Sequence, residues 1–238
     1  MKHLKPSYMD SIIDRLAYLK KIVPVRQLDP TKPLMILIDP GHGGMVNGKY
    51  TTAPNKMFDH GDFVFYEGVY NRLIAYELAL QLRMNNYSYH ILVPEDTDPS
   101  VYERVRRAET IKKEMKGTIH EKMYYHSIHG NAFGLENVSG VEVFTSPGYT
   151  KADPLATIYF HHLAQLGWKM RPDWSDGDPD KEEKFHVLVN STMPALLSET
   201  GFYTNYEEAK LMLKIDTVQA IAHLFLMAHS EIIKLKLI

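Results

Sequence analysis

The stretch Met35-Ile-Leu-Ile-Asp-Pro-Gly-His-Gly-Gly44 decides how this chain folds. The apolar run from Met35 to Ile38 predicts a short buried strand. The Asp-Pro-Gly sequence that follows favours a turn and ends the strand. His42 is therefore expected at the carboxyl end of a buried strand, between glycines that leave it room to face outward. Since open α/β sheets bind ligands in the crevice at this edge, His42 is a candidate functional residue.

The composition is that of an ordinary globular protein. The chain has 238 residues, of which 45% are hydrophobic and 24% charged, and its formal net charge is −2. This length allows one substantial α/β domain, whereas two domains would each be small. The nearly balanced charge argues against a nucleic-acid-binding protein, which usually has a strong basic excess. The absence of cysteine excludes disulfides and thiolate metal sites, so any metal must be held by histidine, aspartate or glutamate.

The first 33 residues are predicted to form a segment that precedes the main domain. Apolar residues at helical spacing predict an amphipathic helix over 7–23 that packs on the domain surface, and the prolines of 24–33 predict a linker. We find no apolar core of a secretory signal and no apolar run long enough to span a membrane. We therefore expect an N-terminal helix and linker in 1–33, a main domain in 34–238, no signal peptide and no membrane insertion.

Predicted strands and helices alternate along the main domain. Ser100, with Glu103 three residues later, is typical of a helix start. Segments 45–65 and 171–184 are predicted to be loops. The alternation predicts a single α/β domain with a mostly parallel, twisted sheet flanked by helices. Strands are expected at 35–38, 89–94, 124–129, 140–145, 185–189 and 195–198, and helices at 66–84, 100–116, 153–167, 205–213 and 218–236.

Four polar residues fall where core residues are not expected. His42, His129 and Glu199 each follow or end a predicted strand, and Glu67 begins the first long helix. A parallel sheet gathers such strand ends at one edge. Two histidines and a glutamate form a known ligand set for catalytic zinc, and the remaining glutamate would then be the base that acts on the zinc-bound water. Spacing alone leaves other interpretations open, because Glu67 could complement the helix dipole and His129 could be a structural histidine.

A second histidine competes with His129 for the crevice. His126 is three residues away, and residues three apart on a regular strand face opposite sides. Only one of the two can therefore point into the crevice, and His129, nearer the strand end and beside Gly130, is the better placed. His60 and His186 flank the two predicted loops and are candidates for substrate contacts.

The candidate residues lie in four segments, which are Ile38-Asp-Pro-Gly-His-Gly-Gly44, Tyr66-Glu-Gly-Val-Tyr-Asn71, Ser127-Ile-His-Gly-Asn131 and Pro194-Ala-Leu-Leu-Ser-Glu-Thr-Gly-Phe-Tyr-Thr-Asn205. Taken in order, these segments resemble the zinc-dependent N-acetylmuramoyl-L-alanine amidases of bacterial cell-wall remodelling and of phage endolysins, the Amidase_3 family. A fifth segment, Tyr102-Glu-Arg-Val-Arg-Arg-Ala108, is similar to the family's Arg-bearing helix. The resemblance covers about residues 34–234, and the ordered set is far more specific than any one motif.

The resemblance implies one Zn²⁺ held by His42, Glu67 and His129 at the carboxyl edge of the sheet, with Glu199 as the catalytic glutamate. The substrate it implies is peptidoglycan, cut at the amide between N-acetylmuramic acid and L-alanine. Zinc would lower the pKa of its bound water toward ~7, and Glu199 would take the proton and deliver it to the leaving amine. Segment 34–238 is then the catalytic domain of a hydrolase that degrades the cell wall.

Two positions depart from the family's pattern. Gly130 stands where a small residue such as alanine is usual, and Ser198 stands where an aliphatic residue commonly precedes the catalytic glutamate. The predicted loop 45–65 is also longer and more aromatic than expected. We recognise no inserted helix that would block the zinc, so we expect an open site.

The absence of a signal peptide and of wall-binding repeats makes the chain look more like a phage or prophage endolysin than a secreted amidase. Such a bacteriolytic enzyme would remain in the host cytoplasm until its release to the cell wall. We expect a monomer whose partner is peptidoglycan and not nucleic acid. The alternatives are a zinc peptidase or carboxypeptidase acting within the stem peptide, and a catalytically silent wall-binding module. The presence of all four candidate residues argues against the second alternative.

Overall fold

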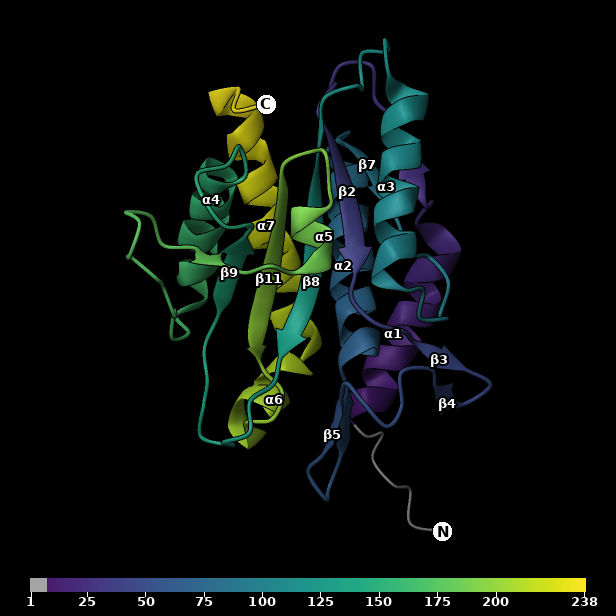
Figure 1. Ribbon diagram of the computed structural model, residues 1–238. Coiled ribbons are helices and arrows are strands. Elements are labelled where there is room, and N and C mark those ends of the chain that lie inside the picture. Colours follow the sequence, from purple (N-terminus) through teal and green to yellow (C-terminus); the bar gives the residue numbers. More distant parts are fainter. Residues whose placement is uncertain (1–7) are drawn as a thin grey trace.

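A seven-stranded sheet forms the centre of the molecule (Figure 1). The computed structural model describes residues 8–238. The strand that begins at Met35 lies inside the sheet, and the predicted α/β fold is confirmed. In spatial order the strands are β1 (Arg26–Gln27), β7 (Ser88–Ile91), β2 (Met35–Pro40), β8 (Met123–Asn131), β11 (Ala195–Phe202), β9 (Glu142–Thr145) and β10 (Lys181–Glu182).

The middle of the sheet is parallel. Strands β7, β2, β8 and β11 run the same way, so their carboxyl ends meet at one edge, which is the lower edge in Figure 1. The outer strands break this pattern, because β1 pairs antiparallel with β7 and β9 pairs antiparallel with β11. The sheet is therefore mixed but mostly parallel, as the alternation of strands and helices predicts.

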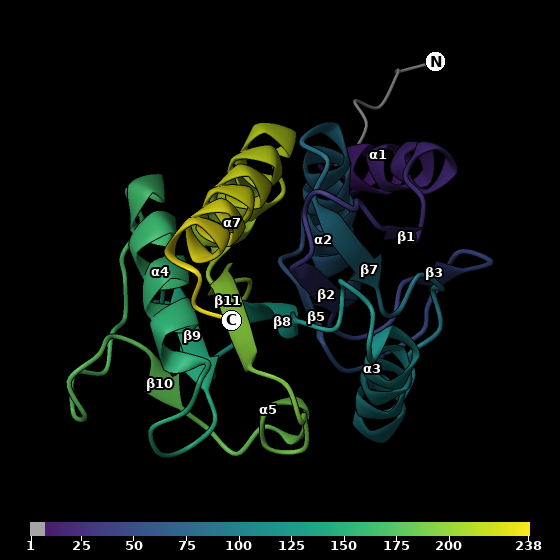
Figure 2. The ribbon, with the colours of Figure 1, turned by 90° about the horizontal axis from the view of Figure 1, so that it is seen from above.

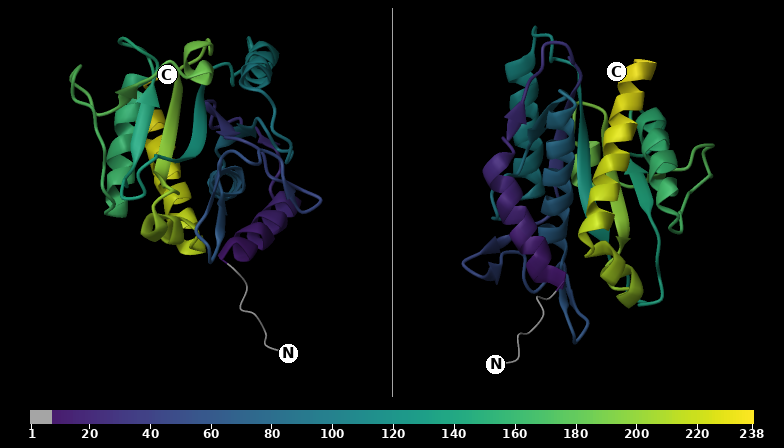
Figure 3. Two further views of the ribbon diagram at one scale, coloured as in Figure 1. Left: turned by 60° about the horizontal axis from the view of Figure 1, so that its bottom comes forward. Right: turned by 180° about the vertical axis from the view of Figure 1, so that it is seen from behind.

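Helices cover the two faces of the sheet unequally (Figure 2). One face carries α2 (Glu67–Met84), α7 (Ile215–Leu235) and α4 (Asp153–Leu163), and the other carries α3 (Val101–Met115) and the short α5 (His186–Val189). The helix α4 continues into the 3-10 turn η1 (Ala164–Leu166), and α6 (Tyr206–Met212) precedes α7. The helix α1 (Tyr8–Ile22) lies against α2 (Figure 3, right).

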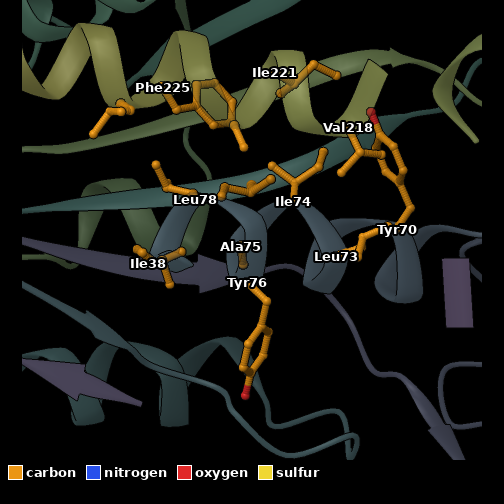
Figure 4. Packing of buried hydrophobic residues seen from close by; sticks show 14 of the residues in the cluster. Ile38, Tyr70, Leu73, Ile74, Ala75, Tyr76, Leu78, Val218, Ile221 and Phe225 are labelled. Carbon is orange, nitrogen blue, oxygen red and sulfur yellow. The ribbon is translucent and has the colours of Figure 1, made fainter. Parts of the chain in front are cut away.

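The largest part of the core lies between α2, α7 and the sheet. Ile74 and Leu78 of α2 face Ile221 and Phe225 of α7 (Figure 4). These four side chains are fully buried, and burial of each stabilises the fold by roughly 2 kcal/mol relative to exposure. The apolar stripe of α1, which includes the fully buried Ile12, joins the same core. The amphipathic pattern of the N-terminal segment is thus explained by packing on α2.

The predicted start of α3 is confirmed. The hydroxyl of Ser100 accepts a hydrogen bond from the backbone N–H of Glu103 at 3.3 Å. The carboxylate of Glu103 pairs with Arg106 and Arg107 instead of returning to the cap. Only one of the two hydrogen bonds of a capping box is therefore formed.

Several local predictions were wrong. The predicted loop 45–65 contains two hairpins, formed by β3 (Met45–Val46) with β4 (Lys49–Tyr50) and by β5 (Met57–Asp59) with β6 (Val64–Tyr66). The predicted strand 185–189 is the helix α5, because both edges of β11 are already occupied by β8 and β9 and the segment instead turns to bury Val187 and Leu188. The short edge strands β1 and β10 lie in the predicted linker 24–33 and the predicted loop 171–184.

Two predictions concern the ends of the fold. The predicted N-terminal helix is confirmed as α1, but residues 1–7 lie outside the described residues, and the domain boundary at residue 33 stays a prediction. Within residues 8–238, no single helix is long and apolar enough to cross a membrane. The helices α6 and α7 meet that criterion only when taken together, across a bend of 74°.

Candidate metal centre

Three neighbouring strands and one helix bring the candidate residues together. His42 lies two positions beyond the end of β2, and β8 is the parallel neighbour of β2. His129 of β8 and Glu199 of β11 are directly paired, so their side chains leave the same face of the sheet. Glu67 is the first residue of α2. The four residues therefore lie near the carboxyl edge of the sheet, where the sequence predicts them.

His42, Glu67 and His129 approach one another closely. Each offers one possible ligand atom, and these atoms all lie within 4.8 Å of one another. The Oε1 atom of Glu67 is 3.2 Å from Nε2 of His42 and 3.0 Å from Nδ1 of His129. The two imidazole rings are nearly perpendicular, at 84°, with centroids 4.9 Å apart. One carboxylate is thus shared between two imidazoles, in a cluster small enough for a single cation to reach all three.

Two glycines make this approach possible. A Cβ on Gly41 would lie 2.2 Å from the ring of His129, and a Cβ on Gly68 would lie 1.9 Å from the carbonyl oxygen of Gly43. Real Cβ atoms essentially never come within 3.0 Å of such atoms. His42 itself has a φ of 62°, a left-handed conformation that costs a non-glycine residue about 1–2 kcal/mol. The surrounding structure must therefore hold it in place.

Two buried arginines hold the backbone of His42. The carbonyl oxygen of His42 accepts hydrogen bonds from Arg72 at 2.6 Å and from Arg104 at 3.0 Å. Arg104 also donates to Asp39 at 2.5 Å and to the carbonyl of Pro40 at 2.7 Å. Charge-assisted hydrogen bonds of this kind are the strong ones in proteins. The Arg-bearing helix recognised in the sequence therefore fixes the segment that carries His42.

The carboxylate of Glu67 has further neighbours. Glu67 is buried, and Nδ2 of Asn71, one turn along α2, donates to its Oε1 at 3.4 Å. The ammonium of Lys56 lies 3.9 Å from Oε2 of Glu67, and the backbone N–H of Glu67 donates to the carbonyl of Lys56 at 3.1 Å. Sequence reasoning missed Lys56, because it lies in the segment predicted to be a loop and reaches Glu67 only through the hairpin β5–β6.

The pKa values of the two acids move in opposite directions. Burial raises the pKa of Glu199 well above its ordinary value, and the charge of Glu67 adds to this rise. Burial also opposes ionisation of Glu67, but the neighbouring His42 and His129 outweigh it and lower the pKa of Glu67. Burial lowers the pKa of His129, against the opposing effect of Glu67. Two carboxyl groups whose pKa values are pushed apart are typical of an acid and base pair at a reaction site.

A cavity of about 410 Å³ opens beside the three clustered residues. His42, His129 and Glu199 are among the residues that line it, together with residues of α5 and of the first turn of α3. His186 of α5 lines the cavity and packs against the exposed Tyr102 of α3, with ring centroids 4.1 Å apart and ring planes tilted by 56°. The cavity is large enough to admit part of a substrate, and its far wall carries aromatic side chains.

The other two singled-out histidines lie away from the cavity. His126 faces the opposite side of the sheet, as strand alternation predicts, and its Nε2 lies 2.9 Å from Oγ of Ser198. Nε2 of His60 lies 2.9 Å from the carbonyl oxygen of Tyr203, and the ring of His60 packs on Phe63. His186 lines the cavity and His60 does not, and a substrate contact of either residue stays a prediction.

The clustered residues fit a divalent cation. Nε2 of His42 and Oε2 of Glu67 are buried and have no hydrogen-bond partner, and the same is true of Oε2 of Glu199. A buried polar atom without a partner costs about 1–3 kcal/mol, and a bound cation would satisfy the first two. Two imidazole nitrogens and one carboxylate form a donor set that zinc takes in proteins. His42, Glu67 and His129 could therefore hold zinc.

The sequence is similar to those of known amidases. Residues 36–228 match the family model described as N-acetylmuramoyl-L-alanine amidase. The amidase CwlM of Bacillus licheniformis is 28% identical over 193 residues, which are 79% of this chain and 64% of that protein. The germination-specific N-acetylmuramoyl-L-alanine amidase of Bacillus subtilis is 28% identical over 187 residues, which are 77% of this chain and 73% of that protein. The aligned region thus spans slightly less than two thirds of the first relative.

Solved structures share the fold. An N-acetylmuramoyl-L-alanine amidase of Clostridium difficile 630 superposes with a TM-score of 0.68 and 24% identity, covering 85% of this chain and 98% of that one. The catalytic domain of CwlV from Bacillus (Paenibacillus) polymyxa gives a TM-score of 0.65 and 22% identity, covering 84% of this chain and 98% of that one. At these identities the structures establish the common α/β architecture.

Proposed function

Because this chain belongs to the N-acetylmuramoyl-L-alanine amidase family, we propose that it hydrolyses the amide bond between N-acetylmuramic acid and L-alanine in peptidoglycan. The observation that carries the proposal is the cluster of His42, Glu67 and His129, whose ligand atoms lie within 4.8 Å of one another beside a cavity that Glu199 also lines. Buried polar atoms without a hydrogen-bond partner are uncommon in native proteins, and His42, Glu67 and Glu199 each contribute one at this edge.

His42, Glu67 and His129 are the proposed zinc ligands. Zinc, when bound, lowers the pKa of a water toward ~7 and polarises the carbonyl group that is attacked. Asn71 contacts Glu67, and Arg72 contacts the backbone of His42, so these residues orient the proposed ligands. Loss of a residue that orients a metal ligand typically lowers the metal affinity 10–100-fold. Lys56 keeps positive charge at the mouth of the site, 3.9 Å from Glu67.

Glu199 is the proposed general base and acid. Its carboxylate takes a proton from the attacking water, whose oxygen forms a bond to the amide carbon. The same carboxyl group then gives the proton to the nitrogen of L-alanine as the carbon–nitrogen bond breaks. One water is consumed, and the products are a free lactyl carboxylate and a free amine. The unpartnered Oε2 of Glu199 supports this role, because no protein donor competes for it.

Digestion of purified peptidoglycan, followed by mass spectrometry, tests the proposal. The zinc-loaded protein should release stem peptides that begin with a free L-alanine amine, and a chelator should stop the release. Cuts inside the stem peptide would instead indicate a peptidase or carboxypeptidase. No cleavage by protein that holds zinc would indicate a wall-binding module.

A matched variant identifies the base. Glu199→Gln should keep the fold and bind zinc, but lower kcat by roughly 10²–10⁴-fold, the contribution of general acid–base catalysis. Glu183→Gln, at an exposed position that is not among the residues lining the cavity, is the control and should leave kcat unchanged. Wild-type turnover by Glu199→Gln would remove Glu199 as the base. A monomeric state, and release from a host cytoplasm as an endolysin, stay predictions.

A further inference from the structure

The acidic loop (residues 171–184) contains a buried acid that the proposed hydrolysis does not use. Asp173, Asp176, Asp178 and Asp180 follow one another at short intervals around Gly177. Most of this loop is exposed, but the side chain of Asp180 is almost completely buried, with 2% of its surface exposed. Buried carboxyl groups are expensive unless they are paired, so the surroundings of Asp180 require an explanation.

The two oxygens of Asp180 differ in their contacts. Its Oδ2 accepts a hydrogen bond from the hydroxyl of Thr145 on β9 at 2.6 Å. Its Oδ1 is buried and has no hydrogen-bond partner. The backbone N–H of Asp180 donates to Oδ1 of Asp178 at 3.3 Å, and the carboxyl group of Asp178 is close enough to that of Asp180 to raise its pKa. Two carboxyl groups therefore meet here with one unsatisfied buried oxygen.

The nearest charges do not compensate Asp180. Burial raises its pKa to about 8, and the carboxyl groups of Asp178 and Asp153 add to the rise. Asp153 is itself occupied by the backbone N–H and hydroxyl of Thr150. Lys181, the next residue in the chain, directs its ammonium to Glu142 at 2.6 Å. Among residues 8–238, no hydrogen bond or ion pair joins a cationic side chain to Asp180.

We propose that Asp178 and Asp180 hold a hard divalent cation, with Ca²⁺ as the ion of choice. The side-chain donors at this point are carboxylate and hydroxyl oxygens, which suit Ca²⁺, whereas zinc prefers nitrogen and sulfur. Closely spaced aspartates around a glycine turn are also the pattern of calcium-binding loops, and Gly177 has a φ of 108° that few other residues adopt. With only two carboxylates, the expected Kd is on the order of 10⁻⁴–10⁻³ M, as for extracellular calcium modules.

A cation at this place would act on β10, the outermost strand, which is separated by β9 from the strand that carries Glu199. Lys181 follows Asp180 and begins β10, and its partner Glu142 lies directly across from Glu199 in the pairing of β9 with β11. A cation that holds Asp180 therefore also fixes β10, from which Lys181 contacts Glu142 beside Glu199. The cation site itself does not depend on whether the proposed hydrolysis occurs.

Terbium luminescence and thermal unfolding test the site in the zinc-loaded full chain. Trp174 lies in the same loop and is 59% exposed, so it can transfer energy to Tb³⁺ bound at Asp178 and Asp180. We expect tryptophan-sensitised emission that millimolar Ca²⁺ displaces. Wild-type protein in 10 mM Ca²⁺ should unfold roughly 3 °C higher than without it, for a Kd near 1 mM. Trp174→Phe should lose the emission and keep the thermal shift.

Three variants separate the site from general attraction of cations to acidic surface. Asp180→Asn and Asp178→Asn should lose both the displaceable emission and the thermal shift. Asp176→Asn, an exposed residue of the same loop, is the matched control and should keep both. Asp180→Asn should also fold without Ca²⁺, because it removes the buried acid. Equal responses of Asp180→Asn and wild type, or no response of wild type to Ca²⁺, would overturn the proposal.

Discussion

Replacing Gly68 with alanine tests whether the close approach of α2 to the segment after β2 assembles the metal centre. The new Cβ would lie 1.9 Å from the carbonyl oxygen of Gly43, whereas real Cβ atoms stay beyond 3.0 Å. The two backbones must therefore separate by about 1.1 Å, because the clash is with backbone and no side chain can rotate away. Glu67 is the residue before Gly68, so it moves with the helix, while His42 stays with the segment after β2.

The size of this displacement sets the expected effect. Metal-ligand distances tolerate deviations of about 0.2 Å, so a shift of about 1.1 Å between Glu67 and His42 is several times too large. We expect the affinity for Zn²⁺ to fall at least 10–100-fold, the range seen when ligand orientation is disturbed. Overpacking of the backbone should also lower the free energy of unfolding by about 1–3 kcal/mol.

Competition with a chromophoric chelator measures the affinity, and urea titration of the metal-free protein measures the free energy of unfolding. Gly134→Ala is the matched control, because a Cβ there meets nothing within 4 Å. Its zinc affinity should equal that of wild type. If Gly68→Ala binds zinc as tightly as Gly134→Ala, the close approach of the two backbones does not set the ligand geometry, and the reasoning fails.

Three further predictions follow from the same structure. His129→Ala should abolish zinc binding in equilibrium dialysis, whereas His126→Ala should retain it; the reverse result would exchange their roles. A chelator should stop hydrolysis while leaving the far-UV circular dichroism unchanged, and loss of both would indicate a structural metal. Burial lowers the pKa of His229 to about 3, whereas unfolded histidine titrates near 6.5, so below pH 6.5 the unfolded chain binds a proton that the folded chain does not. Stability should therefore fall by about 2 kcal/mol from this residue between pH 7 and pH 5, and urea titrations of His229→Gln should lack that part of the slope.

The candidate residues could be found in the sequence because their positions follow from a simple rule. Parallel strands end at one edge, so polar residues at the ends of predicted strands are expected to meet there. His129 and Glu199 satisfy this rule in register, and His42 follows it from β2. The two-residue period of a strand showed that only one of His126 and His129 can face the crevice, and the position of His129 nearer the strand end decided between them. Each of these signals depends on residues that are close together in the sequence, so it can be recognised before the fold is known.

The residues that sequence reasoning missed reach the site through tertiary packing. Lys56 is brought to Glu67 by the hairpin β5–β6. The sequence of this hairpin has no hydrophobic run long enough to predict two strands. Segment 185–189 has the composition of a strand, but β11 has no open edge, so it became α5 and brought His186 to the cavity. Which strand edges are occupied is a property of the whole sheet, and no local pattern contains it.

Ser198, which precedes Glu199, has its partner His126 on the opposite face of the sheet. Oγ of Ser198 lies 2.9 Å from Nε2 of His126, and both side chains are fully buried. Removing one partner leaves the other buried and unpaired at about 1–3 kcal/mol, whereas replacing both with apolar groups can be nearly neutral. We therefore expect the losses in Ser198→Ala and His126→Leu to sum to about 0.5–3 kcal/mol more than the loss in the double variant. Urea unfolding of the four proteins measures this difference. Additivity within about 0.5 kcal/mol would mean that the two residues do not stabilise each other, and that the departure at Ser198 is not compensated by His126.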